Sequence, residues 1–113
     1  MLLLLFFNIL FAQETMYFDG HKAMDYLEYQ CSFGPRYPGS PGHTEFGLSL
    51  ESFLKERADF VHVFKDSALS QIDGEKVELK SIIARFNPTS DYRIMIMAHW
   101  DTRKYADMED DEK

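Results

Sequence analysis

The stretch "YRIMIMAHWD", residues 92–101, decides the fold that the sequence predicts. Its centre, residues 94–98, is a continuous apolar run, without the alternation of apolar and polar residues that a half-buried strand shows. Such a run is typical of a strand that is buried on both faces, as in the centre of an α/β sheet. A sheet of this kind needs helices on both of its sides. We therefore expect an α/β fold with three layers.

Two helices are predicted before the first strand. Apolar residues recur at four-residue steps from Ala23, which predicts a helix over residues 20–31 with Asp19 as its cap. Ser40 followed by Pro41 is a good start for a second helix, which the pattern continues to about residue 58.

The segment between the helices is the loop "GPRYPGSPGH", residues 34–43, whose prolines and glycines exclude regular structure over most of its length. We interpret it as a brace for the entry to the second helix, with Arg36 bonded to a nearby carboxylate or to backbone carbonyls. Gly42 and Gly47 weaken the first turns of this helix. They either let another backbone or a ligand come close or are simply tolerated.

Three strands are predicted after the helices. Residues 59–66, "DFVHVFKD", alternate with a period of two, and residues 77–86, "VELKSIIARF", form a second strand after a turn at "QIDGEK". The run at 92–98 is the third, and we expect it to form a hairpin with the second. Two helices and three strands can hardly cover both faces of such a sheet, so we expect either more protein after Lys113 or a covering partner.

Composition limits the class of protein. The 113 residues are 45% hydrophobic and carry a net charge of −7, which allows one small core and argues against nucleic acid as a partner, because that binding needs clustered Lys and Arg. The acidic run at 107–112 is expected to be a solvated tail, since its spacing does not match a calcium loop. Cys31 is the single cysteine, so it is interpreted as a buried or idle thiol.

The first 13 residues, "MLLLLFFNILFAQ", are interpreted as a signal peptide, which predicts a secreted or periplasmic protein. Their apolar run is too short for a transmembrane span, which needs about 20 residues. A membrane anchor and a misplaced start codon are the alternatives for this segment.

A candidate metal site follows the third strand. His99 and Asp101 stand two residues apart where the apolar run stops, so their side chains point the same way in an extended chain. An imidazole and a carboxylate can form a metal ligand with its orienting partner, or two ligands. The same three-residue pattern also arises by chance. Trp100 points to the other face, as a core residue or a pocket wall, and the other histidines, His21, His43 and His62, are weaker candidates.

The loop "GPRYPGSPGH" and the segment "IMIMAHWDTR", residues 94–103, occur together in an order that resembles the zinc-dependent glutaminyl-peptide cyclotransferases and, more broadly, the related zinc aminopeptidases. The resemblance covers residues 18–113 and corresponds to the N-terminal part of the family's domain. It implies a secreted or periplasmic α/β enzyme with a mixed central sheet and a zinc site at strand ends.

What the resemblance implies for single residues differs between the two branches. In an aminopeptidase with two zinc ions, the residue matching His99 binds one zinc and the residue matching Asp101 orients it. In a cyclotransferase one zinc is bound by an Asp, a Glu and a His farther along the chain, and His99 is a neighbour of the site. Trp100 and Arg36 are then pocket or loop residues, and this chain holds no catalytic residue.

The two motifs resemble bacterial-type cyclotransferases, which convert the N-terminal glutamine of a peptide or protein to pyroglutamate with release of ammonia. We therefore expect a fragment of such an enzyme, inactive by itself because a catalytic zinc needs three protein ligands. A fragment of a zinc aminopeptidase is the first alternative. A short secreted binding protein without catalysis, docking through an exposed strand edge, is the second.

Overall fold

The structure is a computed structural model that describes residues 17–70 and 73–105. The predicted signal peptide at residues 1–13 and the acidic run at residues 107–112 lie outside the described residues. Both therefore stay predictions.

Helix α1 spans Gly20–Cys31, as the sequence predicts. The Asp19 carboxylate accepts a hydrogen bond from the Lys22 amide at 3.0 Å and caps the first turn. The apolar face predicted from Ala23 is largely exposed, because two tyrosines make the contact with the second helix instead. Tyr26 packs edge-on against Phe53, with the ring centroids 5.5 Å apart. The Tyr29 hydroxyl lies 2.8 Å from the Ser49 hydroxyl.

Helix α2 spans Pro41–Lys55. Its start is as predicted, with the Ser40 hydroxyl accepting from the His43 amide at 3.2 Å. It ends three residues before the predicted residue 58, because the chain must turn into the first strand, where the Asp59 amide already donates to the Arg85 carbonyl at 3.0 Å.

Strands β1, Phe60–Leu69, and β2, Lys76–Arg85, pair as an antiparallel hairpin. The register runs from Phe60 opposite Arg85 to Leu69 opposite Lys76. Gly74 supplies the left-handed conformation of the turn, with φ of 73°. The hairpin therefore joins the first two predicted strands, and the prediction that the last two would pair is wrong.

Residues 92–98 form no strand in the structure, which corrects the predicted total of three. After β2 the chain turns at Asn87, whose φ is 46°, and at Pro88, which has no amide hydrogen to offer a neighbouring strand. The far end of the segment is bonded to the loop before α2, at Arg36 and Thr102, and not to β2. The segment thus runs past the hairpin without pairing with it.

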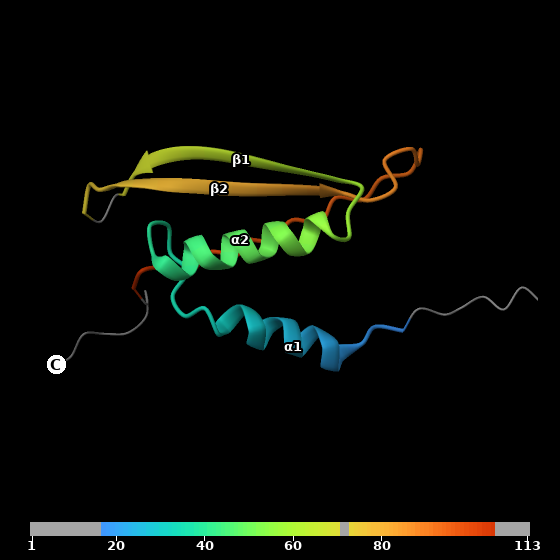
Figure 1. The fold of residues 1–113 in the computed structure, drawn as a ribbon, viewed down its shortest axis with the longest axis horizontal. Coiled ribbons are helices and arrows are strands. Elements are labelled where there is room, and N and C mark those ends of the chain that lie inside the picture. Colours follow the sequence, from blue (N-terminus) through green and yellow to red (C-terminus); the bar gives the residue numbers. More distant parts are fainter. Residues whose placement is uncertain (1–16, 71–72, 106–113) are drawn as a thin grey trace, which may run out of the picture.

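The chain has an α/β fold in which both helices lie on the same side of the hairpin (Figure 1). Helix α2 lies between the hairpin and α1, and the segment after residue 92 runs behind α2 in this view (Figure 1). The inner faces of the strands are half-buried against α2, while the aromatic side chains of Phe60 and Phe64 on the outer face are exposed. Within the described residues the sheet is covered on one face, so the predicted third layer is not seen there.

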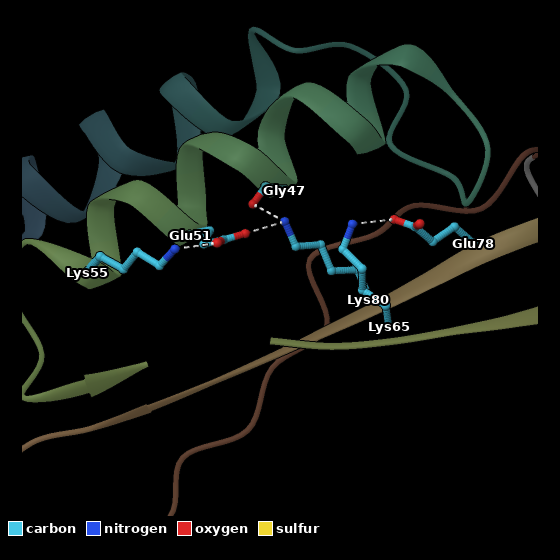
Figure 2. Close-up of polar contacts among 6 residues, drawn as sticks. All are labelled: Gly47, Glu51, Lys55, Lys65, Glu78 and Lys80. Atoms are coloured by element: carbon cyan, nitrogen blue, oxygen red, sulfur yellow. Dashed lines mark hydrogen bonds and ion pairs between the residues drawn. The ribbon is translucent and has the colours of Figure 1, made fainter. Parts of the chain in front are cut away.

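Lys80 connects β2 to α2 (Figure 2). Its side chain is 7% exposed and its ammonium donates to the Gly47 carbonyl at 3.0 Å and to the Glu51 carboxylate at 2.8 Å. The hydrogen bond from Lys55, followed by that from Lys80, lowers the pKa of the Glu51 carboxyl to about 2. These contacts hold the middle of β2 next to residues 47–51 of α2.

No helix among the described residues has the length and apolar character needed to cross a membrane.

Candidate functional site

The two motifs that the sequence singles out meet in the structure. The Arg36 amide donates to the Thr102 hydroxyl at 2.9 Å, and the Thr102 amide donates back to the Arg36 carbonyl at 3.1 Å. The Arg36 guanidinium is buried and donates to three carbonyls, those of Trp100 at 3.1 Å, Gln30 at 2.8 Å and Gly34 at 3.2 Å. Of the two partners expected for Arg36, the structure therefore shows the carbonyls. We call the contact between Arg36 and residues 100–102 the clasp.

His99 directly precedes the clasp, and its imidazole lies on the same side of the chain as the carboxylate of Asp101, which belongs to the clasp. Nδ1 of His99 is 2.9 Å from the Asp101 carbonyl oxygen and 3.6 Å from the Asp101 carboxylate. A protonated Nδ1 donates to that carbonyl, which leaves Nε2 with the lone pair that a metal or a proton would take. The His99 side chain is 86% exposed, so its free nitrogen faces solvent.

Trp100 packs inward, on the opposite side from His99. Its indole stacks on the imidazole of His43, with ring centroids 4.4 Å apart and planes inclined by 15°, and lies 5.9 Å from the Phe46 ring. A Cβ on Gly47 would meet the indole at 3.0 Å, and a Cβ on Gly42 would meet the Phe33 carbonyl oxygen at 2.4 Å. Trp100 is half-buried and its contacts are packing contacts with α2, and both glycines permit a close approach.

His43 is the one histidine buried among the described residues, with 7% of its surface exposed. Loss of solvent lowers the pKa of its imidazole below the usual 6.5, and the nearby carboxylates of Asp101 and Glu78 oppose this effect. It is therefore neutral at neutral pH. Sequence patterns do not distinguish His43 from His21 and His62, because its burial depends on Trp100, a residue more than fifty positions away.

An open cavity of about 500 Å³ lies between the loop before α2, the hairpin turn and residues 102–105. Lys104 crosses it and pairs with Asp73 at 2.6 Å, with the Tyr37 ring 5.6 Å from its ammonium. Hydrogen bonds from Lys104, Ser70 and the Glu75 amide lower the pKa of Asp73 to about 2. The sequence shows the turn at Asp73 but not that residues 102–105 would reach it.

The described residues do not complete a zinc site. No group of three or more His, Cys, Asp or Glu side chains suited to a metal occurs in residues 17–70 and 73–105. His99 and Asp101 offer two ligands at most, whereas catalytic zinc sites use three protein ligands. The thiol of Cys31 is exposed, which excludes the predicted buried thiol. The alternative interpretation, an idle thiol, is the one that stays.

Comparison with known proteins gives no match, neither to a family model, nor to a curated protein, nor to a solved structure. The resemblance to zinc cyclotransferases thus rests on the two motifs alone.

Proposed function

We propose that the chain is the N-terminal part of a zinc-dependent glutaminyl-peptide cyclotransferase. The observation that carries the proposal is the clasp, in which the loop at 34–43 and the segment at 94–103 bind one another through Arg36 and Thr102. Two motifs that are bonded together across some sixty residues form one structural unit, which makes their joint occurrence a stronger argument than two separate short matches.

The uncovered segment at 94–98 supports a larger domain around this unit. The side chains of Ile94, Met95, Ile96 and Met97 are between 82% and 92% exposed, and residues 94–98 make no backbone hydrogen bond to another described residue. An extended apolar segment with both edges and both faces free is matched to a position in the middle of a sheet between two helical layers. In the proposal, the continuation of the domain supplies these layers and the remaining zinc ligands.

The proposed reaction is attack of the α-amine of an N-terminal glutamine on its own side-chain amide carbon. The amide C–N bond breaks, ammonia leaves and pyroglutamate forms. In this scheme His99 and Asp101 neighbour the catalytic centre and belong to its wall. If the enzyme is instead an aminopeptidase, Nε2 of His99 is the atom that would bind a metal.

The first test is the sequence of the gene and transcript beyond the Lys113 codon. The proposal expects an open frame with further α/β pattern and an Asp, a Glu and a His suited to zinc. A genuine stop codon directly after Lys113 in the mature transcript would refute the enzyme proposal and favour the secreted binding protein.

The second test uses the protein made from that longer frame. It is incubated with a peptide that begins with glutamine and, separately, with one that begins with leucine. A cyclotransferase releases ammonia from the first and blocks its amino terminus, whereas an aminopeptidase releases a free amino acid from the second. If the enzyme is an aminopeptidase, His99→Gln should lower its activity, because the substitution removes the metal-binding Nε2. His62→Gln is the matched control, because His62 lies on the outer face of β1, away from the clasp.

A third, inexpensive test separates the fragment from the stand-alone binding protein. The 113-residue chain is purified and its association is followed by light scattering. A fragment should associate through residues 92–98, and Ile94→Lys with Ile96→Lys should make it monodisperse. A chain that is monodisperse without these substitutions would favour the binding protein.

A further inference from the structure

The hairpin turn carries an Asp-Gly pair, Asp73–Gly74, and the sequence holds one other such pair, Asp19–Gly20. An Asp-Gly pair rearranges without an enzyme, because glycine has no Cβ to keep its amide nitrogen away from the aspartate side chain. The glycine nitrogen attacks Cγ of the protonated aspartate, so that a C–N bond forms, the Cγ–OH bond breaks and water leaves with the amide proton. Water then opens the succinimide ring at either carbonyl carbon and gives aspartate or isoaspartate.

Both reacting groups of Asp73–Gly74 are engaged elsewhere in the structure. The Gly74 amide donates to the Ser70 carbonyl at 2.8 Å. One Asp73 carboxylate oxygen accepts from the Glu75 amide at 3.2 Å, and the other accepts from the Lys104 ammonium at 2.6 Å. The carboxyl group must leave these donors before it can turn onto the Gly74 nitrogen.

Lys104 differs from the other partners because it comes from a distant part of the chain. Ser70 and Glu75 belong to the turn and move with it, whereas Lys104 follows the clasp directly in the sequence. Its ammonium lies 5.6 Å from the Tyr37 ring and 5.9 Å from the Tyr105 ring. The side chains of Asp73 and Lys104 are each 29% exposed, so the contact is partly shielded from water.

The same contact keeps Asp73 in its unreactive form. The hydrogen bonds from Lys104, from Ser70 and from the Glu75 amide lower the pKa of the Asp73 carboxyl to about 2. The carboxyl is therefore ionised at neutral pH. An ionised carboxylate has no hydroxyl to lose as water, so it does not form the succinimide ring. Position and ionisation thus act in the same direction.

We infer that Asp73–Gly74 is a site of isoaspartate formation and that Lys104 restrains the reaction by holding the Asp73 carboxylate. Isoaspartate runs the main chain through Cγ and adds one carbon to the turn, while the free carboxylate is left on Cα. The modified turn therefore loses the ion pair with Lys104 that crosses the cavity of about 500 Å³. The inference does not depend on the proposed enzyme, since it involves neither zinc nor substrate.

The test uses the whole 113-residue chain, kept folded at neutral pH for several weeks. Isoaspartate at each Asp-Gly pair is measured by fragmentation mass spectrometry of its peptides and by resistance to a protease that cuts before aspartate. A sample unfolded in urea gives the unrestrained rate. We expect isoaspartate at Asp73 to form more slowly in the folded chain than in this reference.

Variants assign the restraint to Lys104. Lys104→Met should raise the rate at Asp73 by about twofold to fivefold, as expected for the loss of one partly exposed ion pair. Lys104→Arg keeps a cation and should stay near the wild-type rate. Lys65→Met is the matched control, because it removes the same charge from β1, where Lys65 pairs with Glu78 at 3.4 Å.

Asp19–Gly20 is an internal control in every sample, because its carboxylate caps α1 and is distant in the chain from the hairpin turn. Its rate should not respond to Lys104→Met, whereas global unfolding would accelerate both pairs. An unchanged rate at Asp73 in Lys104→Met would overturn the inference, as would equal acceleration of the two pairs or an equal rate in the folded and unfolded wild type. Absence of isoaspartate at Asp73 even in urea would show that it is no site at all.

Discussion

Gly42→Ala tests whether the backbone at residues 33–35 lies as close to the first turn of α2 as the structure shows. The added Cβ would stand 2.4 Å from the Phe33 carbonyl oxygen and 2.6 Å from the Pro35 carbonyl oxygen. Real Cβ contacts do not fall below 3.0 Å, and both obstacles are backbone atoms that no side-chain rotation can move. The loop must therefore shift away from the helix by about half an ångström or more.

The expected loss of stability can be worked from these contacts. Forced expansion of a packed site costs about 1–3 kcal/mol. The shift also displaces the Pro35 carbonyl from the Ser40 hydroxyl, now 2.9 Å away, and a hydrogen bond of this kind contributes about 1 kcal/mol. Alanine regains up to about 1 kcal/mol through its higher helix propensity. The net destabilisation is about 1–3 kcal/mol, a large share of the total stability of a small domain.

Gly20→Ala is the matched control, because it also changes a glycine in the first turn of a helix. A Cβ on Gly20 meets its nearest atom, in the Phe18 ring, at 3.9 Å, which is ordinary contact. This variant should be neutral or up to about 1 kcal/mol more stable. Urea unfolding at neutral pH, followed by circular dichroism, measures both. Equal effects of the two substitutions, or a stabilised Gly42→Ala, would refute the close approach.

Three further predictions concern the contacts around α2. Arg36→Lys should destabilise the chain by about 1.5–3 kcal/mol in urea unfolding, because one ammonium cannot serve the carbonyls that the planar guanidinium reaches; an unchanged midpoint would contradict the clasp. The pKa of Glu51 is lowered to about 2, so thermal stability should fall as the pH drops from 4.5 toward 2, and Lys80→Met should flatten this dependence, whereas an equal slope in both proteins would contradict the ion pair. Ser40→Ala should cost about 1 kcal/mol or more in urea unfolding, since its hydroxyl caps α2 and also binds the loop; Asp19→Ala, which removes a cap that binds no loop, should cost less.

The starts of both helices could be predicted because the signals are local. Asp19 and Ser40 lie next to the amides that they cap, and a cap is visible in three or four residues of sequence. The end of α2 could not be predicted in the same way. It depends on Asp59 meeting Arg85, a contact that exists only once the hairpin has formed.

The pairing of the strands shows a different limit. The continuous apolar run at 94–98 predicts a strand that is buried on both faces, but it does not indicate which strand will be its neighbour. Loop entropy does not decide between the two possible hairpins, because the connections at residues 70–75 and 86–91 are equally long. The chain instead leaves β2 through Asn87 and Pro88, which turn it away from the sheet. The segment at 92–98 is directed by the clasp instead, and the clasp joins residues more than sixty positions apart.

In the candidate site, too, features that depend on neighbouring residues could be predicted, and features that depend on distant contacts could not. The common side of His99 and Asp101 follows from the two-residue period of an extended chain. The stack of Trp100 on His43 has no counterpart in any local pattern, because it requires the loop, α2 and the clasp to be in place together. Distant contacts of this kind set the environment of a titratable group, and sequence shows only its identity.

The clasp and the uncovered segment at 94–98 are connected energetically. Burial of one large aliphatic side chain contributes about 1.5–3 kcal/mol, so Ile94, Met95, Ile96 and Met97 together offer about 6–12 kcal/mol to whatever covers them. An unanchored segment would lose part of this gain in becoming ordered, at about 1–2 kcal/mol for each residue. Arg36 and Thr102 already hold the segment at one end. The loop "GPRYPGSPGH" therefore holds one end of the segment at 92–98, which in the proposed larger domain would reduce the entropy cost of enclosing that segment between further layers.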